Sequence, residues 1–148
     1  MAGGARHDPT PDFNFLVEID GLTAAGFSEC SGLSSETDVI EYREGNERAH
    51  SARKIPGLTH YGPVTLRRGI TTSRDLWDWR QSVIDGQLSR RSVAITLLSE
   101  SGEPVLRWML RDAWIAKWEG PHLRARSSEV AIESIELVHE GIRLESAG

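Results

Sequence analysis

Apolar and polar residues alternate with a period of two along most of the chain, which is the pattern of strands that bury one face. The segments that show this alternation are residues 13–19, 25–31, 36–43, 64–68, 93–97 and 106–118. Asp112 interrupts the last segment, and we expect a bulge or a bend in the strand at that position. Most of the chain is therefore predicted to form β-sheet.

One segment has the period of a helix instead. Its apolar residues, which predict the core face of the helix, are Leu76, Trp79, Val83 and Ile84. Thr72 is a suitable N-cap with Asp75 three residues later, and Gly86 is placed to end the helix in a left-handed conformation. Trp77 lies off this apolar stripe, so we expect it to be partly exposed or at an interface. The sequence thus predicts an all-β domain that carries one helix.

The pattern near the end of the chain is ambiguous. Val130 and Ile132 would share one face of a strand, whereas Ile135 and Leu137 would lie on the other. A helix would also be satisfied by the apolar and small residues of the same segment, which are Ala131, Ser134, Ile135 and Val138. The residues themselves leave both alternatives open.

A long polar connection spans residues 44–62, and it has almost no apolar period. It contains a basic cluster, in which Arg48, Arg53 and Lys54 are the prominent members. Connections longer than about 12–15 residues without secondary structure are uncommon in compact domains and are often functional or disordered. We therefore expect residues 44–62 to form a functional loop.

Length and charge restrict the possible classes of protein. With 148 residues the chain is expected to form a single domain over residues 13–148, preceded by a flexible arm at residues 1–12. The net charge of −5 disfavours nonspecific binding to nucleic acid, which depends on cations. Residues 1–12 lack the apolar core of a secretion signal, and no apolar run is long enough to cross a membrane. Assembly in the cytoplasm is expected.

Candidate chemistry is sparse. Cys30 is the single cysteine, and the five histidines are scattered without the spacing of a metal site. No glycine-rich phosphate loop and no nucleophile elbow occurs. The tryptophans at positions 108, 114 and 118 are explained by packing in the core rather than by sugar binding. We expect no catalytic residue, no metal and no cofactor, although a small β-barrel enzyme or a ligand-binding module is the alternative from another class.

Seven short motifs occur in a fixed order along nearly the whole chain, from residue 11 to residue 144. They are FLVEIDG with GFSECSGL, ETDVIEYREG, GPVTLRRGIT, LWDWR, WEGP and SEVAIESIELVHEGI. In this order they resemble the tail tube family of contractile phages. The resemblance is stronger to the inner tube proteins of phage-derived contractile injection systems.

The resemblance implies a fold and an assembly. The fold would be mainly β with one α-helix, in which two antiparallel sheets pack as a sandwich or open barrel and the helix lies at the edge. Six subunits would form a ring in which one sheet of each joins a continuous barrel around a channel. Closing a ring removes the unpaired strand edges that long strands otherwise expose. For the segment near the end of the chain, the resemblance also favours a strand over a helix.

The resemblance also implies roles for particular residues and partners. Glu36 and Asp38 would share a strand face that lines the lumen. The basic residues that we expect to contact the next ring are Arg48, His50, Arg53 and Lys54. The partners would be further copies of the chain, a sheath protein, baseplate and spike proteins, a cap, and protein cargo in the lumen. The final location would be an injection particle, extracellular or retained in the cytoplasm. A phage tail tube that passes DNA is the runner-up.

Overall fold

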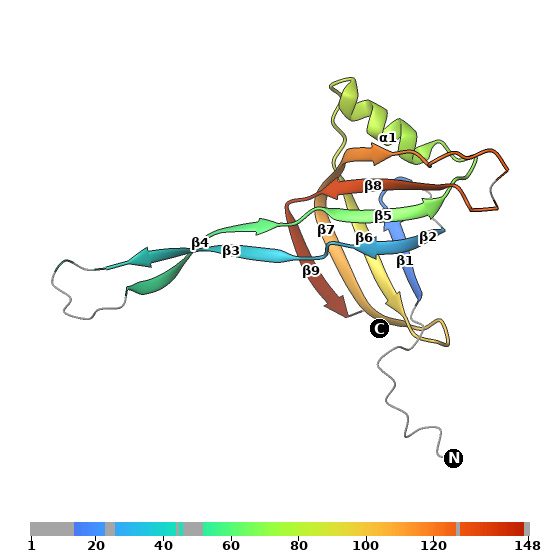
Figure 1. The fold of residues 1–148 in the computed structure, drawn as a ribbon. Helices are drawn as coiled ribbons and strands as arrows, with labels where there is room; N and C mark the ends of the chain where they lie inside the picture. The colour runs from blue at the N-terminus through green and yellow to red at the C-terminus, as the bar shows by residue number, and fades with distance from the viewer. Residues whose placement is uncertain (1–13, 23–25, 44, 46–51, 127, 147–148) are drawn as a thin grey trace, which may run out of the picture.

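The structure is a computed structural model that describes residues 14–22, 26–43, 45, 52–126 and 128–146. Within these residues it has one helix, α1 (Asp75–Ile84), and nine strands (Figure 1). The strands are β1 (Asn14–Ile19), β2 (Phe27–Ser31), β3 (Ser35–Tyr42), β4 (Arg53–Tyr61), β5 (Val64–Gly69), β6 (Arg91–Leu98), β7 (Pro104–Glu119), β8 (Ile132–Val138) and β9 (Gly141–Ser146). The predicted arm at residues 1–12 lies outside the described residues.

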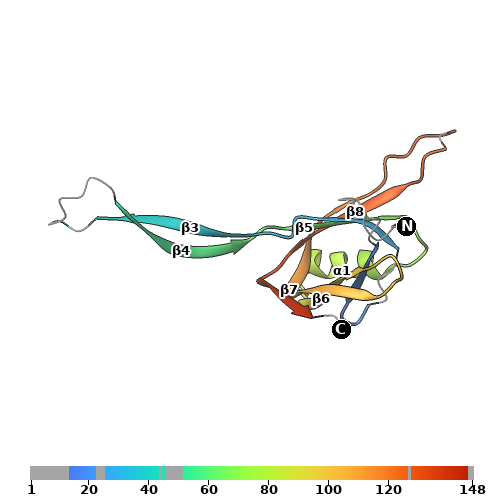
Figure 2. The same ribbon diagram turned by 90° about the horizontal axis from the view of Figure 1, so that it is seen from below.

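Two antiparallel sheets share the long strand β7. Hydrogen bonding follows the order β1-β6-β7-β8-β5-β2, and β9 pairs with β7. The first half of β7 lies between β6 and β9, and its second half pairs with β8. We call β1, β6, β9 and the first half of β7 the first sheet, and β2, β5, β8 and the second half of β7 the second sheet. The two sheets enclose one core and do not close into a barrel (Figures 1 and 2).

The bend expected at Asp112 is present. Asp112 has a φ of 52°, and the register between β6 and β7 shifts by one residue there. The shift moves the buried face of β7 from even to odd positions, because Leu110 is buried before it and Ala113 and Ile115 after it. Trp114 consequently lies half-buried beside the core rather than inside it. A second register shift, between Ile115 and Lys117, returns the inner face to even positions, so Trp118 packs half-buried against the core opposite Ile135.

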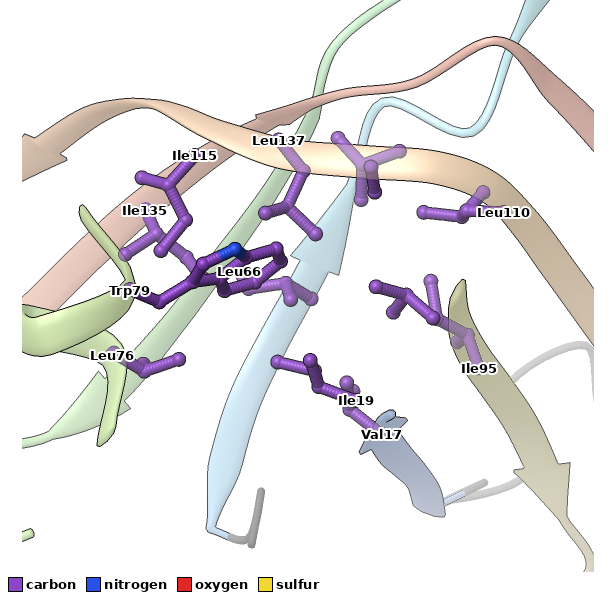
Figure 3. Close-up of a cluster of buried hydrophobic side chains, with 13 residues drawn as sticks. Val17, Ile19, Leu66, Leu76, Trp79, Ile95, Leu110, Ile115, Ile135 and Leu137 are labelled. Carbon is purple, nitrogen blue, oxygen red and sulfur yellow. The ribbon is translucent and has the colours of Figure 1, made fainter. Parts of the chain in front are cut away.

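The helix closes one end of the space between the sheets (Figure 2). Leu76 and Trp79 point into the core among side chains from both sheets (Figure 3). Val83 is half-buried, and Ile84 is 60% exposed, so its placement on the core face was wrong.

Both ends of the helix are defined by the chain next to it. At the start the expected Thr72 cap is wrong, because α1 begins at Asp75 after Arg74 and no side chain caps it. Ser73 instead accepts a hydrogen bond from the Asp75 amide, at 3.4 Å. Gly86 ends the helix with a φ of 80°, as expected. The described residues contain no helix that is long and apolar enough to cross a membrane.

The ambiguous segment near the end of the chain is a strand. β8 pairs with both β5 and β7, and its Ile135 and Leu137 side chains are buried in the core. Val130, just before this strand, is 74% exposed, and Ile132 is also exposed. The structure therefore shows the strand alternative and not the helix. Ile135 and Leu137 lie on one face of the strand, and Ile132 lies on the other.

The expected loop at residues 44–62 is largely wrong. Residues 53–61 form β4, which pairs with β3 in an antiparallel hairpin, and residues 44 and 46–51 lie outside the described residues. The first residues of β3 and β4 continue the register of β2 with β5 as far as Thr37, where it shifts, so the hairpin extends the second sheet. Glycines join the two parts: a Cβ on Gly32 would collide with the Pro63 carbonyl oxygen, and one on Gly62 with the Ser34 hydroxyl.

An ion pair is buried within the second sheet. The Arg68 Nε donates to Glu133 Oε1 at 2.7 Å, and these side chains are 3% and 11% exposed. The other carboxylate oxygen accepts a hydrogen bond from the Trp118 indole at 3.1 Å. Glu133 therefore connects three neighbouring strands, β5, β7 and β8.

Removing one member of this pair should be costly. In the Glu133→Ala variant the Arg68 guanidinium stays buried without its counter-charge, so the free energy of unfolding should fall by about 3–5 kcal/mol. Denaturant unfolding of the isolated subunit measures this change. The control is Glu29→Ala, which removes the exposed partner of Arg67 and should cost less than about 1 kcal/mol. Equal losses in the two variants would contradict the role given to Glu133.

Candidate assembly surfaces

The β3–β4 hairpin projects far from the two sheets (Figures 1 and 2). Every residue of β3 is exposed, and in β4 only Gly57 and Tyr61 are half-buried. An isolated two-stranded hairpin is at best marginally stable in water, because it has no core to cover it. The hairpin is therefore incomplete as a structure of one chain.

Apolar side chains occupy both faces of this hairpin. Val39 lies opposite Pro56 and Ile40 opposite Ile55, and successive residues of a strand point to opposite faces. The exposed fraction is 64% for Val39 and 72% for Leu58. Large apolar groups exposed together on a protrusion indicate a surface that another protein covers. The hairpin thus presents apolar surface for a partner on each face.

The part of the hairpin nearest the body is polar. The Asp38 carboxylate and His60 Nε2 are 3.0 Å apart, and the hydroxyls of Thr37 and Thr59 are also 3.0 Å apart. The hydrogen bond and the charge of Asp38 raise the pKa of His60 above its ordinary value, and Glu36 adds a smaller effect in the same direction. Glu36 and Asp38, the candidate lumen residues, are both exposed on β3.

Two of the four candidate stacking residues can be placed. Arg53 and Lys54 begin β4, where they lie opposite Tyr42 and Glu41 and are exposed. They are therefore strand residues near the far end of the hairpin and not loop residues. Arg48 and His50 lie outside the described residues.

Among the described residues, the sheets also leave strand edges without a partner strand. β1 and β2 end the hydrogen-bonded path, and within the described residues β9 pairs with β7 alone. Such edges expose backbone groups that can pair with another chain. Together with the hairpin they make an assembly surface distributed around the subunit.

The candidates for chemistry are not brought together. The described residues contain no group of three or more His, Cys, Asp or Glu side chains that could hold a metal ion. Burial raises the pKa of the Cys30 thiol to about 11, so the thiol is protonated at neutral pH and is a poor nucleophile. Glu133 and Glu136 point to opposite faces of β8, because Glu133 is buried and Glu136 lies on the outer side.

The residues that the sequence analysis missed are the apolar ones of the hairpin, above all Val39, Ile40, Ile55 and Leu58. Residues 53–58 carry no period-two signal, because each of the two strand faces mixes a charged residue with an apolar one. Pro56 and Gly57 argue further against a strand. Proline is nevertheless tolerated on strands with a free edge, and β4 is such a strand where it passes beyond the body.

A two-sheet subunit with free edges and an uncovered apolar hairpin is a building block of a larger assembly. The comparison by sequence identifies its class. The family described as T4-like virus tail tube protein gp19 matches residues 11–143, and the chain belongs to this family. No curated protein matches the chain.

Solved structures agree with this assignment. A chain of the PVC sheath/tube terminator in the extended state, from an extracellular contractile injection system, is 28% identical with a TM-score of 0.82, covering 96% of this chain and 100% of that one. A chain of the PVC sheath-tube complex in the extended state is 27% identical with a TM-score of 0.81, covering 95% and 93%. A chain of the anti-feeding prophage cap (AFP tube terminating cap) is 26% identical with a TM-score of 0.81, covering 97% and 95%.

The pair of Asp38 and His60 gives a direct test of the hairpin geometry in solution. The pKa of His60 is raised in the folded hairpin, so the ion pair with Asp38 stabilises the folded hairpin. This stabilisation is fully present below the ordinary histidine pKa, and it is lost as the pH rises through the raised pKa of His60. We expect Asp38→Asn to lower the pKa of His60 towards its ordinary value. Glu36→Gln is the matched control and should lower it less. An NMR titration of the His60 ring measures both, and an unchanged pKa in Asp38→Asn would show that the pair does not form.

Proposed function

We propose that the protein is a structural subunit of the inner tube of a contractile injection system. Six copies form a ring around a central channel, and the rings stack head to tail into a tube. A head-to-tail contact does not close on itself and so produces a filament. The observation that carries this proposal is the β3–β4 hairpin, which needs cover on both faces. This protein also matches injection-system structures over 95–97% of its length.

The partners follow from the related assemblies. Their descriptions name a sheath-tube complex, a sheath/tube terminator and a tube-terminating cap. By extension, the tube of this protein is surrounded by a sheath and ends at a cap, with a baseplate and spike at the other end. Contraction of the sheath drives the tube outward with protein cargo in its lumen. This role is mechanical and needs no catalytic step.

A phage tail tube is the second candidate, because the matching family is named for a virus tail tube protein. The two functions differ in what passes through the channel. Particles purified from the native host distinguish them: protein cargo in the tube supports an injection system, and a tail joined to a DNA-filled capsid supports a phage.

Within the tube we assign the hairpin to contacts between subunits. Its apolar part is covered by neighbouring copies, and Arg53 and Lys54 at its far end face acidic groups of the next ring. Arg48 and His50 belong to the same stacking element. Glu36 and Asp38, nearer the body, are candidates for the lumen side of the hairpin. Burying the apolar residues offsets the entropy lost when the hairpin is ordered.

The proposal is tested by making the hairpin polar without touching the core. The double variant Ile40→Ser with Ile55→Ser should keep the melting temperature of the isolated subunit within a few degrees, because both side chains are already exposed. It should not form tubes when co-expressed with sheath and baseplate proteins, as seen by negative-stain microscopy. The matched control, Ile40→Val with Ile55→Val, keeps an apolar surface and should form normal tubes. Normal tubes from the Ile40→Ser, Ile55→Ser variant would refute the hairpin as an assembly element.

Charge reversal separates stacking from ring formation. Arg53→Glu with Lys54→Glu should leave single rings but shorten or abolish tubes, because like charges then meet at the contact between rings. Normal tubes from the charge-reversed variant would show that residues other than Arg53 and Lys54 hold the rings together.

A further inference from the structure

His139 lies at the root of the β3–β4 hairpin, in the turn between β8 and β9 (Figure 1). The pairing of β5 with β8 ends at Val64 and Leu137. Continuing that register would place Gly62 opposite His139. The side chain bridges this position, because its Nε2 lies 3.2 Å from the Gly62 carbonyl oxygen. The half-buried imidazole thus adds one more link between β8 and the chain where the hairpin leaves the body.

Both ring nitrogens of His139 face backbone carbonyl oxygens. Besides the contact of Nε2 with Gly62, Nδ1 lies 3.2 Å from the carbonyl oxygen of Gly141. A carbonyl oxygen only accepts hydrogen bonds, and a neutral imidazole has one N–H donor whereas the protonated ring has two. The protonated ring therefore makes both hydrogen bonds, and the neutral ring makes one of them.

The two carbonyl groups differ in how firmly they are held. Gly141 begins β9 and pairs with Arg111 of β7, so the first sheet fixes its position. Gly62 lies in the connection between β4 and β5, outside both strands. The bond to Gly141 closes within one turn, whereas the bond to Gly62 joins segments 77 residues apart. We therefore expect a ring with a single N–H to keep Gly141 and to release Gly62.

The charged groups around the ring have partners of their own. Tyr61 packs its ring against the imidazole, with the centroids 5.6 Å apart. Tyr61, Arg111 and Arg143 line a groove of about 360 Å³ beside Gly141. The Arg111 Nη2 donates to the Glu140 carbonyl oxygen at 2.8 Å, and the Glu140 carboxylate lies 4.0 Å from Arg90. Arg143 is paired with the Glu145 carboxylate at 2.6 Å. The protons on His139 therefore decide how many of the two bonds are made.

We propose that His139 is a proton-controlled latch at the root of the hairpin. The protonated ring holds Gly62 to the turn between β8 and β9 and fixes the direction in which the hairpin projects. The neutral ring lets the hairpin pivot, so the hairpin is released as the pH rises through the range in which histidine loses its proton. Resting on the proposed function, subunits then join a tube more readily in mildly acidic solution, because a hairpin already held in place loses less entropy on binding.

Two substitutions separate the two bonds of the latch. His139→Gln places an amide nitrogen where Nε2 lies and keeps a donor for Gly62, whereas His139→Asn places one where Nδ1 lies and keeps a donor for Gly141. Neither amide titrates, so the first variant is held and the second released at every pH. Both variants retain His60, so any effect of its pair with Asp38 is common to all the proteins compared.

The mobility of the hairpin is measured as the width of the distance distribution between two spin labels. The labels are attached at Leu58→Cys on β4 and Val105→Cys on β7, both of which are exposed. The parent also carries Cys30→Ser, which removes the single native thiol. Free subunits are compared at about pH 5 and about pH 8, on either side of the range in which histidine titrates.

We expect the parent to give a narrow distribution in acid and a broader one at the higher pH. His139→Gln should be narrow and His139→Asn broad under both conditions. A parent distribution that does not change with pH would overturn the latch, and so would a pH response of equal size in His139→Asn. The measurement uses free subunits, so these results do not depend on tube formation. A parent that forms no tubes with its sheath and baseplate would instead contradict the proposed function.

Discussion

One ladder of strands governs this subunit: β2 and β3 run against β5 and β4, from inside the body to beyond it. The register is kept from Glu29 to Thr37 and shifts by one residue on either side of that stretch. Over its first part the ladder is covered by a core, in which Leu66 is fully buried. Over its second part no other element of the described residues covers it. The glycines at positions 32 and 62 allow the chain to pass between these parts without a break in register. In the proposed tube the same strands thus build the interior of one subunit and the contact with the next.

The body holds that ladder in place. β7 is bent at Asp112 so that one strand serves both sheets, and β8 followed by β9 pairs along the same bent strand. The buried pair of Arg68 and Glu133 joins β5 to β8, and the Trp118 indole adds β7. An ion pair of this kind is costly to break, which fixes these strands relative to one another. A rigid second sheet gives the hairpin a defined direction in which to reach a neighbour.

Much of the fold could be predicted from local pattern. Alternation located most strands, the helical period located α1, and the polar interruption at Asp112 indicated the bend in β7. Some failures were local and others depended on contacts between distant residues. The start of α1 was misplaced because Ser73 and not Thr72 meets the Asp75 amide. The final strand was ambiguous until its pairing with β5 and β7 was known.

The assembly surface was the hardest part to predict, for a physical reason. Ile40 and Ile55 would normally be assigned to a core, yet in one subunit they are exposed, and in the proposed tube their cover belongs to other copies. A strand that is completed only by a neighbour lacks the one-sided burial on which pattern analysis relies.

The central claim is that neighbouring copies complete the β3–β4 hairpin, and amide hydrogen exchange measures this most directly. In the free subunit we expect the amides of β3 and β4 to exchange rapidly, while those of the buried strand β6 exchange slowly. In assembled tubes the hairpin amides should become as strongly protected as those of β6. Hairpin amides that exchange equally fast in tubes and in the free subunit would contradict the account.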